Sequence, residues 1–444
     1  MQVTFHLNEG ATWSDGTPVT ANDVVFTCRA LSKVDYNSRS SYLVYIDGTD
    51  DNGYELSENS LAVEAADEYT VVVTLKEPVD ESMLFGNFKR ILIIPEHVYG
   101  DMPLAEIATA SNWSENPVTC GAMLLDAQIS GEQIELVAND DFYLGRPNID
   151  RIIVKVMTSS AMAAALTTGE IDFTPGANIS SLNYSDYDTL TSADNIVVEA
   201  VKTYSFQYLA VDWGTYSQEV RQALSLAIDR QSIVNNVLLG NGEPLLTQYV
   251  SISDYYMSEL YEDENPGYDP DRAVELLNEA GWDFDQQITL YYHSGNDMRE
   301  QTCLMIQQYW QAIGLNVALQ AQDTSSMMAG LSSGDFTLGT MGQSGDDTAY
   351  NYVDLYTQGH PVVDMSHLTT SYFYDVMAAM KFMTSTDEIV AESVELQEQM
   401  IEQVPYIYLY SPYTLQAANS SLQNYVMTDA NAYYWPVWEW DIAA

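Results

Sequence analysis

The segment Ser205–Gly242 constrains the fold more than any other part of the chain. Its first part, Phe206–Asp212, is short and rich in aromatic and aliphatic residues, which is typical of a buried strand. Apolar residues then recur at helical spacing over Val220–Leu238, which predicts one long amphipathic helix. Gly240 and Gly242 can adopt the positive φ angles that end a helix. The segment therefore predicts a buried strand that runs directly into a long helix, as in α/β domains.

The same order of elements repeats in the second half of the chain, with a glycine or proline between each helix and the strand that follows it. This repetition predicts a mostly parallel sheet with helices on its faces, because parallel strands need long crossover connections. The predicted strands are Ile288–Tyr292, Asn316–Gln322, Asp335–Thr340 and Tyr406–Tyr410, and the helices before them are Pro270–Gly281, Glu300–Ile313, Ser326–Ser332 and Asp387–Gln403.

Shorter elements are predicted near the start of the chain. Val3–Leu7 is an extended segment, and Thr20 with Asp23 forms the capping pattern of a helix over Ala21–Leu31. Alternating apolar residues around a turn predict a hairpin over residues 61–75. These elements indicate a mixed α/β region rather than a helical bundle.

Length and charge limit the class of protein. A chain of 444 residues is too long for one simple core and indicates two lobes. It contains 64 acidic and 15 basic residues, a formal net charge of −49. Such a surface repels phosphate backbones and anionic lipid headgroups, so we expect no binding to nucleic acid. We interpret the excess of acids as a solvated surface that favours solubility, and adaptation to a cation-rich habitat is the alternative.

The sequence contains no recognisable metal, cofactor or catalytic motif. The three cysteines lack CxxC or metal-ligand spacing, and the five histidines are scattered. The acidic loop Asp47–Asn59 fails the calcium-loop pattern at two essential ligand positions. GQSGD at 342–346 departs from a nucleophile elbow at its last residue, and HExxH, P-loop and GxGxxG motifs are absent. We therefore predict a binding protein, not an enzyme, without a cofactor or metal; a Cys28–Cys120 disulfide is left open.

Three stretches resemble one protein family, in the family's order. They are FHLNEGATWSDGTPVTANDVVFTCRAL at 5–31, ALTTGEID at 165–172 and VRQALSLAIDR at 220–230. On these residues the chain resembles the family 5 extracytoplasmic solute-binding proteins, of the oligopeptide- and dipeptide-binding type, that serve ABC transporters. The resemblance implies an α/β, two-lobed periplasmic-binding-protein-like fold of class II, the large peptide-binder type with an extra subdomain in lobe I.

The resemblance also implies how the chain is divided. A partial accessory subdomain of lobe I would occupy residues 1–116, the lobe I sheet 117–207, lobe II 208–411 and the return to lobe I 412–444. In the family a further segment precedes the first motif. We therefore expect an N-terminal segment, with an export signal, to be missing from this sequence.

The implied function is that of an extracytoplasmic receptor. It would capture a peptide or similar polar solute between its lobes and deliver it to the permease and ATPase of an ABC importer. We expect a monomer in the periplasm or on the outer face of the cell membrane, lipid-anchored through the missing segment. A module for signalling or scavenging without transport is the alternative, and a neighbouring permease gene would discriminate between the two.

The stretch GDFTLGTMGQSGDDTAYN at 334–351 resembles the cleft-lining loop of the family. Asp346 falls on the position that in peptide binders holds the α-ammonium group of the ligand, and an Asx-turn is the alternative interpretation. Gln343 and Thr324 replace tryptophans of the family by hydrogen-bonding groups, which favours a polar ligand, either a short peptide or a saccharide. The full set of predicted ligand-binding residues is Met341, Gln343, Ser344, Gly345, Asp346, Tyr350 and Thr324.

Overall fold

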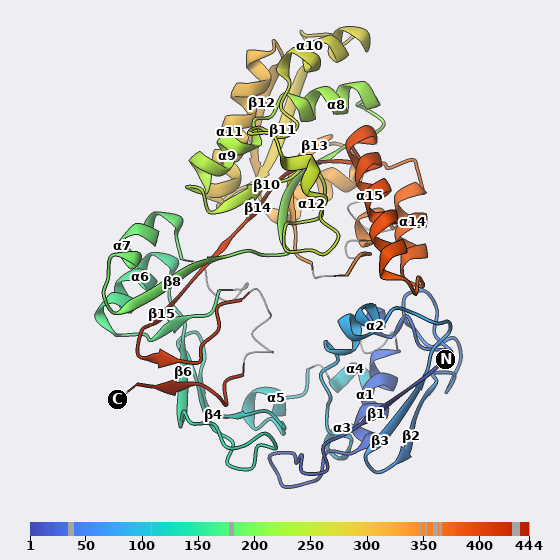
Figure 1. Cartoon of the computed structure of the whole chain (residues 1–444), viewed down its shortest axis with the longest axis vertical. Coiled ribbons are helices and arrows are strands. Elements are labelled where there is room, and N and C mark those ends of the chain that lie inside the picture. Colours follow the sequence, from blue (N-terminus) through green and yellow to red (C-terminus); the bar gives the residue numbers. More distant parts are fainter. Residues whose placement is uncertain are drawn as a thin grey trace. The chain divides into compact units, whose positions relative to one another are not determined.

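The computed structural model describes residues 1–33, 40–107, 109–176, 182–345, 348–350, 353–357, 363, 366–428 and 436–443. The chain forms two compact units (Figure 1). Unit 1 consists of Met1–Thr174, Leu190–Val197 and Ala417–Ala444, and unit 2 of Pro175–Thr189 and Val198–Gln416. The segment 208–411, which the sequence analysis assigns to lobe II, lies inside unit 2.

Unit 1 contains two antiparallel sheets of three strands, in the orders β1-β3-β2 and β4-β5-β6. The predicted hairpin over 61–75 is confirmed as β2 and β3. The predicted capping of the first helix is also confirmed, because the Thr20 backbone N–H donates to Asp23 Oδ2 at 2.8 Å. The elements are β1 (Gln2–His6), α1 (Ala21–Leu31), β2 (Val63–Asp67), β3 (Thr70–Thr74), α2 (Glu81–Phe88), α3 (Glu96–Tyr99), α4 (Leu104–Ile107), α5 (Asn112–Glu115), β4 (Met123–Ile129), β5 (Gln133–Ala138), β6 (Arg151–Lys155), α6 (Ser159–Thr168) and β7 (Phe173–Thr174).

A third sheet, of order β7-β15-β8, contains two strands that cross the boundary between the units along the chain. These strands are β8 (Ile196–Val201) and β15 (Thr414–Asn419), and α7 (Tyr187–Thr191) precedes β8. A short pair, β16 (Leu422–Gln423) and β17 (Asp441–Ile442), follows them in unit 1. The long segment of unit 2, Val198–Gln416, therefore begins and ends in two neighbouring strands of one sheet, and the chain also crosses between the units after Thr174 and after Thr189.

Unit 2 is built on a six-stranded sheet of order β10-β14-β9-β13-β11-β12. Residues of α8–α11 pack in one core on one face of this sheet, and α12 lies against the other face (Figure 1). The elements are β9 (Phe206–Val211), α8 (Gln218–Leu226), α9 (Arg230–Val237), β10 (Gly242–Pro244), α10 (Pro270–Glu279), β11 (Gln287–His293), α11 (Asp297–Ala312), β12 (Asn316–Gln322), α12 (Thr324–Ser333), β13 (Leu338–Gln343), α14 (Tyr372–Met380), α15 (Thr386–Gln403) and β14 (Tyr406–Pro412).

The prediction of a mostly parallel sheet is wrong. Only β13, β11 and β12 form parallel pairs, whereas the pairs β10–β14, β14–β9 and β9–β13 are antiparallel. In the segment Val198–Gln416, β9 is the first strand after β8 and β14 is the last strand before β15. These two strands are adjacent and run in opposite directions, so the sheet is mixed.

The prediction of one long helix over Val220–Leu238 is also wrong, because the helix is broken between α8 and α9. Asp229 caps α9 and accepts a hydrogen bond from the Ser232 backbone N–H at 2.8 Å. Arg230, which is 1% exposed, donates through Nη1 to the carbonyl of Ser225 at 3.0 Å and through Nε to that of Tyr408. The break thus lets one buried guanidinium satisfy carbonyl groups at the end of α8. Gly240 has a φ of +82° as predicted, but Gly242 begins β10.

The core of unit 2 offers a matched test of a buried hydrogen bond. Trp310 of α11 is fully buried, and its Nε1–H donates to the carbonyl of Leu224 in α8 at 2.9 Å. Trp282 also has a buried Nε1–H, but no acceptor lies near it among the residues described. Trp310→Phe is expected to lower the free energy of unfolding by about 1–3 kcal/mol, because a buried carbonyl loses its donor.

The control is Trp282→Phe, which removes a donor that has no acceptor and should change the stability of unit 2 less. Urea unfolding followed by far-ultraviolet circular dichroism measures both variants. Equal losses would show that lost ring volume, and not the hydrogen bond, determines the effect.

All three cysteines are free, so the Cys28–Cys120 disulfide left open above is not formed. Within the part of the chain that the structure describes, no helix is long and apolar enough to cross a membrane. The same residues contain no cluster of three or more His, Cys, Asp and Glu side chains that could hold a metal ion.

Candidate functional site

Three of the predicted ligand residues, Gln343, Ser344 and Thr324, lie at the carboxyl ends of the parallel strands of unit 2. His293 ends β11, Gln322 ends β12 and Gln343 ends β13. The register pairs His293 with Gln322, and β13 runs parallel to β11 beside it. Ligands of open α/β sheets bind at this edge, where side chains from several strands converge.

The structure places the predicted residues as follows. Met341 is buried within β13, Gln343 is partly exposed at its end, and the exposed Ser344 hydroxyl lies 3.0 Å from that of Ser205. Gly345 is partly exposed, Thr324 is the exposed first residue of α12, and Tyr350 is buried with the Lys381 ammonium 5.5 Å from its ring centre. Asp346 lies outside the described residues.

Sequence reasoning missed a basic side chain at this edge, Arg299 in the first turns of α11. Its Nε donates to Gln207 Oε1 of β9 at 2.9 Å, and its Nη1 lies 2.8 Å from His293 Nδ1. Its Nη2 has no acceptor among the residues described, and none of their carboxylates lies within 4.0 Å of the guanidinium. Part of this half-buried cation is therefore available to another acceptor.

Gly342 allows the guanidinium to lie against the backbone of β13. A Cβ atom added at Gly342 would lie 2.5 Å from Arg299 Nη2 and 2.6 Å from Gln207 Nε2. Any larger residue would displace one or both of these side chains. Gln343, the next residue, points to the opposite face of the sheet because side chains alternate along a strand. The Arg299 cluster and Gln343 therefore flank the two sides of the end of β13.

The protonation states of His293 and Arg299 leave the positive charge of Arg299 without a counter-charge from His293. Burial lowers the pKa of His293, and the neighbouring Arg299 charge lowers it further. His293 is therefore neutral at pH 7, and its Nδ1 can accept the hydrogen bond from Arg299. Burial also lowers the pKa of Arg299, but a guanidinium keeps its proton in this environment. Among the described residues, the two hydrogen-bond partners of the guanidinium are therefore neutral and do not balance its charge.

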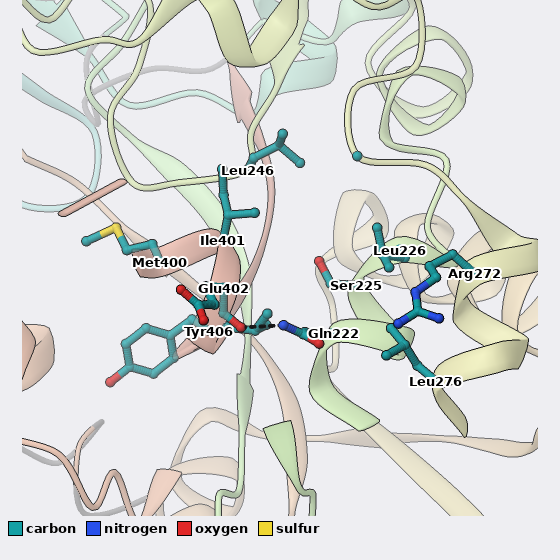
Figure 2. A pocket seen from close by; sticks show the side chains of 12 residues that line it. Gln222, Ser225, Leu226, Leu246, Arg272, Leu276, Met400, Ile401, Glu402 and Tyr406 are labelled. Atoms are coloured by element: carbon teal, nitrogen blue, oxygen red, sulfur yellow. Dashed lines mark hydrogen bonds between the residues drawn. The ribbon is translucent and has the colours of Figure 1, made fainter. Parts of the chain in front are cut away.

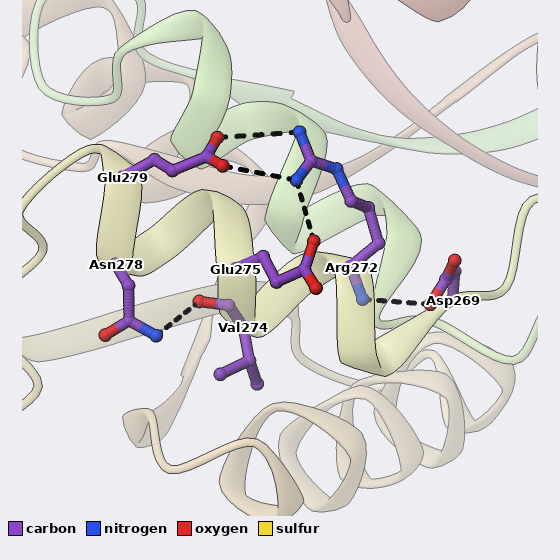
Figure 3. Close-up of polar contacts among 6 residues, drawn as sticks. All are labelled: Asp269, Arg272, Val274, Glu275, Asn278 and Glu279. Atoms are coloured by element: carbon purple, nitrogen blue, oxygen red, sulfur yellow. Dashed lines mark hydrogen bonds and ion pairs between the residues drawn. The ribbon is translucent and has the colours of Figure 1, made fainter.

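Arg299 differs from the other arginines of unit 2 that have been described here. Arg221 and Arg230 are buried, and their guanidinium groups donate to backbone carbonyls, three of them in the case of Arg221. Arg272 is exposed and pairs with two carboxylates of its own helix, Glu275 at 2.8 Å and Glu279 at 3.4 Å (Figure 3). Arg299 combines partial burial, two neutral partners and free donor capacity, which is the arrangement expected of a site for an anionic group.

A pocket of about 260 Å³ lies elsewhere in unit 2, between α8, α10 and the end of α15 (Figure 2). Tyr406, the first residue of β14, lines this pocket. In the sheet, Tyr406 pairs with Ala210, and Ala210 also pairs with Gly339 near the start of β13. The pocket is therefore at the opposite end of the sheet from Gln343. Its one lining arginine is Arg272, whose charge Glu275 and Glu279 already balance, so this pocket lacks the free donors found around Arg299.

Two weak signals in the sequence could have pointed to the Arg299 cluster. One is a basic residue in a chain with only 15 lysines and arginines, located directly after the strand that ends at His293. The other is a glycine inside a buried strand, since an isolated strand glycine often marks a close approach of another group. Neither signal identifies Gln207, which belongs to a distant part of the chain.

Comparison with known proteins identifies the family of the chain. Residues 1–362 match the bacterial extracellular solute-binding proteins, family 5 Middle. The oligopeptide-binding protein AppA of Bacillus subtilis is 26% identical over 444 residues, which cover 94% of this chain and 77% of AppA. The periplasmic oligopeptide-binding protein OppA of Escherichia coli is 26% identical over 434 residues, which cover 92% of this chain and 76% of OppA.

The structure of Bacillus subtilis AppA in complex with a nonapeptide superimposes with a TM-score of 0.76 and 25% identity, over 100% of this chain and 87% of AppA. The chain spans only 57% of the length of related proteins from Brucella species. The two-lobed α/β fold implied by the sequence motifs is confirmed by these similarities. Because the family match covers most of its residues, the chain belongs to the family 5 bacterial extracellular solute-binding proteins.

Proposed function

We propose that this protein is the receptor of an ABC importer and that it captures short, polar peptides with a free carboxylate. The observation that carries this proposal is that Nη2 of Arg299, at the carboxyl ends of the strands, has no acceptor among the residues that the structure describes. A peptide carboxylate can form charge-assisted hydrogen bonds with a guanidinium, which are stronger than neutral ones. A saccharide would leave this charge unpaired. The names of the relatives, which are oligopeptide-binding proteins, support the same ligand class.

The free amino end of the peptide would bind to the carboxylate of Asp346. This proposal rests on the resemblance of residues 334–351 to the ligand loop of the family and on the position of Asp346 two residues after Ser344. Gln343, Ser344 and Thr324 would supply hydrogen bonds to the peptide backbone or to polar side chains. Met341 and Tyr350, which are buried, would supply the apolar part of the predicted site.

The remaining parts of the proposal concern location and partners. The family is extracellular, and we propose that a permease and an ATPase of an ABC importer receive the peptide from this protein. We further propose that the protein acts as a monomer and is attached to the outer face of the cell membrane through a lipid anchor. Light scattering of the purified protein tests the monomer, and detergent-phase partitioning of protein from the native host tests the anchor.

The expected result of a direct test is selective capture of peptides with closure of the two units. Native mass spectrometry of the protein with an equimolar library of unmodified peptides of two to nine residues should detect one bound peptide per chain. Small-angle scattering should then give a smaller radius of gyration with the captured peptide than without it, because ligand shifts a hinged protein towards its closed state.

The control for this test is the same library with amidated carboxyl ends, which should bind much more weakly. Equal capture of the two libraries would contradict the role of Arg299. Capture of a saccharide library in preference to both would contradict the peptide proposal. Identical scattering curves at saturating peptide would contradict capture by closure.

A further inference from the structure

The side-chain amide of Gln207 is held in one orientation by Arg299. A guanidinium group can only donate hydrogen bonds, so the amide atom that lies 2.9 Å from Arg299 Nε must be the oxygen, Oε1. The amide nitrogen, Nε2, can only donate, and no acceptor lies within hydrogen-bond distance of it among the residues described. Gln207 therefore gives its acceptor to Arg299 and keeps its donor group for a ligand.

Gln207 Nε2 and Arg299 Nη2 lie close together over Gly342. A Cβ atom added at Gly342 would lie 2.6 Å from Gln207 Nε2 and 2.5 Å from Arg299 Nη2, so the two nitrogen atoms are neighbours. Both side chains are partly exposed, and in the described part of the chain neither nitrogen has an acceptor. A single acceptor group of a ligand can therefore reach both donors.

The sheet and one helix hold these two donors in place. Gln207 of β9 is paired with Tyr410 of β14 on one side and with Gly342 of β13 on the other. The buried Tyr410 hydroxyl lies 2.8 Å from Thr302 Oγ1, and Thr302 belongs to α11, as Arg299 does. Donors on such rigid elements lose little conformational freedom when a ligand binds.

Arg299 has no counter-charge among the residues that the structure describes. The ionisable groups that act on it are Tyr410, Tyr208 and Cys303, all of them buried. Burial raises the pKa of each of these three groups, so all three are neutral at pH 7. Gln207 is neutral by its chemistry. A glutamate at the same position would instead place a carboxylate on the guanidinium and would remove the amide donor.

A carboxylate and a carboxamide would bind to these donors differently. The two oxygens of a carboxylate both accept hydrogen bonds, so one can bind to Arg299 Nη2 and the other to Gln207 Nε2. A carboxamide has one oxygen and one NH₂ group, so its nitrogen would lie against one of the two donors. The second donor therefore adds to the preference for a carboxylate.

We propose that Gln207 is the specificity-determining residue of the Arg299 site. Its amide supplies a second donor and leaves the guanidinium without a counter-charge, so the site selects a carboxylate over a carboxamide. This inference rests on the proposed function, in which the ligand is a peptide with a free carboxylate, and it names the residue that sets this preference.

Gln207→Glu tests the proposal because it keeps the size of the side chain but replaces the amide donor by a carboxylate. Calorimetric titration with the peptide captured by the parent protein should show binding weakened by more than about tenfold, since the guanidinium is then already paired. The amidated form of the same peptide should bind to Gln207→Glu at least as tightly as to the parent. The preference for a free carboxylate should therefore disappear.

Two further variants separate this effect from general ones. Gln207→Met removes both hydrogen-bonding groups without adding a charge, and it should weaken binding of the unmodified peptide about three- to tenfold. Gln287→Glu adds the same charge at the exposed first residue of β11, the strand whose other end is His293, and should leave the preference unchanged. A thermal unfolding midpoint near that of the parent identifies the variants that are folded.

Acetate and acetamide test the site without a peptide. In protein that contains isotopically labelled arginine, the Nε–H resonance of Arg299 is assigned by its absence from Arg299→Met. At constant ionic strength, acetate should shift this resonance of the parent protein in a saturable way, and acetamide should not. Neither compound should shift it in Gln207→Glu.

Three results would overturn the inference. They are a preference for the unmodified peptide that is as large in Gln207→Glu as in the parent, an acetate response that is the same in both proteins, and no acetate response in the parent. If the parent responds to acetate, Gln207→Glu does not, and the parent captures no peptide, the proposed function fails but the role of Gln207 is confirmed.

Discussion

Replacement of Arg299 by methionine is expected to weaken binding of an unmodified peptide by well over tenfold. The loss should correspond to about 2–5 kcal/mol, the usual cost of removing one partner of a desolvated charge pair. Methionine keeps the aliphatic bulk of the side chain but provides no donor for the carboxylate. Isothermal titration calorimetry of the parent and of Arg299→Met with the captured peptide measures the difference.

The same peptide with an amidated carboxyl end completes a double-mutant cycle. If Arg299 binds the carboxylate, amidation should weaken binding to the parent strongly and binding to Arg299→Met little. Arg272→Met is the matched control, because Arg272 is exposed and already paired with Glu275 and Glu279. Equal effects of amidation on the parent and on Arg299→Met would place the carboxylate elsewhere.

A steric variant tests the same site without changing a charge. Gly342→Ala adds a Cβ that would lie 2.5 Å from Arg299 Nη2, so the guanidinium must move from its present position. We expect this variant to reproduce part of the loss seen with Arg299→Met for the unmodified peptide. Gly121→Ala, where the nearest atom to an added Cβ lies 3.8 Å away, serves as the control.

Asp346→Asn is expected to weaken binding of a peptide with a free amino end by well over tenfold, for the corresponding reason at the other end of the ligand. The carboxylate would hold the α-ammonium group through charge-assisted hydrogen bonds, and asparagine keeps the shape but not the charge. The net charge of −49 should also concentrate ammonium groups near the protein, but salt screens this field over about 10 Å at 0.1 M. The local pair should therefore dominate, and added salt should not restore equal affinities.

Asp347→Asn is the control, because it removes the same charge one residue further along the chain. An N-acetylated peptide provides the second arm, and it should bind equally well to the parent and to Asp346→Asn. Calorimetric titration measures all combinations. If Asp346→Asn binds the unmodified peptide as tightly as the parent, the ammonium anchor is another residue, and an uncharged ligand becomes the better hypothesis.

Local sequence determined much of the secondary structure, because the signals for it lie within a few residues. Thr20 and Asp23 predicted the start of α1, since a capping pattern depends only on the first turn of the helix. The helix predicted from Pro270 likewise begins there as α10, and the Asp269 carboxylate before it accepts a hydrogen bond from the Arg272 backbone N–H at 2.9 Å (Figure 3). The family motifs, each a short run of residues, likewise predicted the fold.

Features that depend on distant segments were not predicted. The antiparallel pairing of β9 and β14 follows from their places near the start and the end of the segment Val198–Gln416, which the helix–strand order does not contain. The break between α8 and α9 depends on Arg230 reaching the carbonyl of Tyr408, a residue that is remote in the sequence. Apolar periodicity continues across that break, so it could not reveal it.

The candidate site also has one part that the sequence predicted and another part that only the tertiary structure revealed. Sequence alone predicted a ligand loop after the strand that ends at Gln343, because the loop motif is continuous in the chain, and this loop stays a prediction. Only the tertiary structure assembled Gln207, His293 and Arg299 around Gly342, because these residues come from β9, β11, α11 and β13. Whether an arginine is free to bind a ligand depends on which acceptors surround it in space. In a chain with 64 acidic residues, that could not be inferred from the sequence.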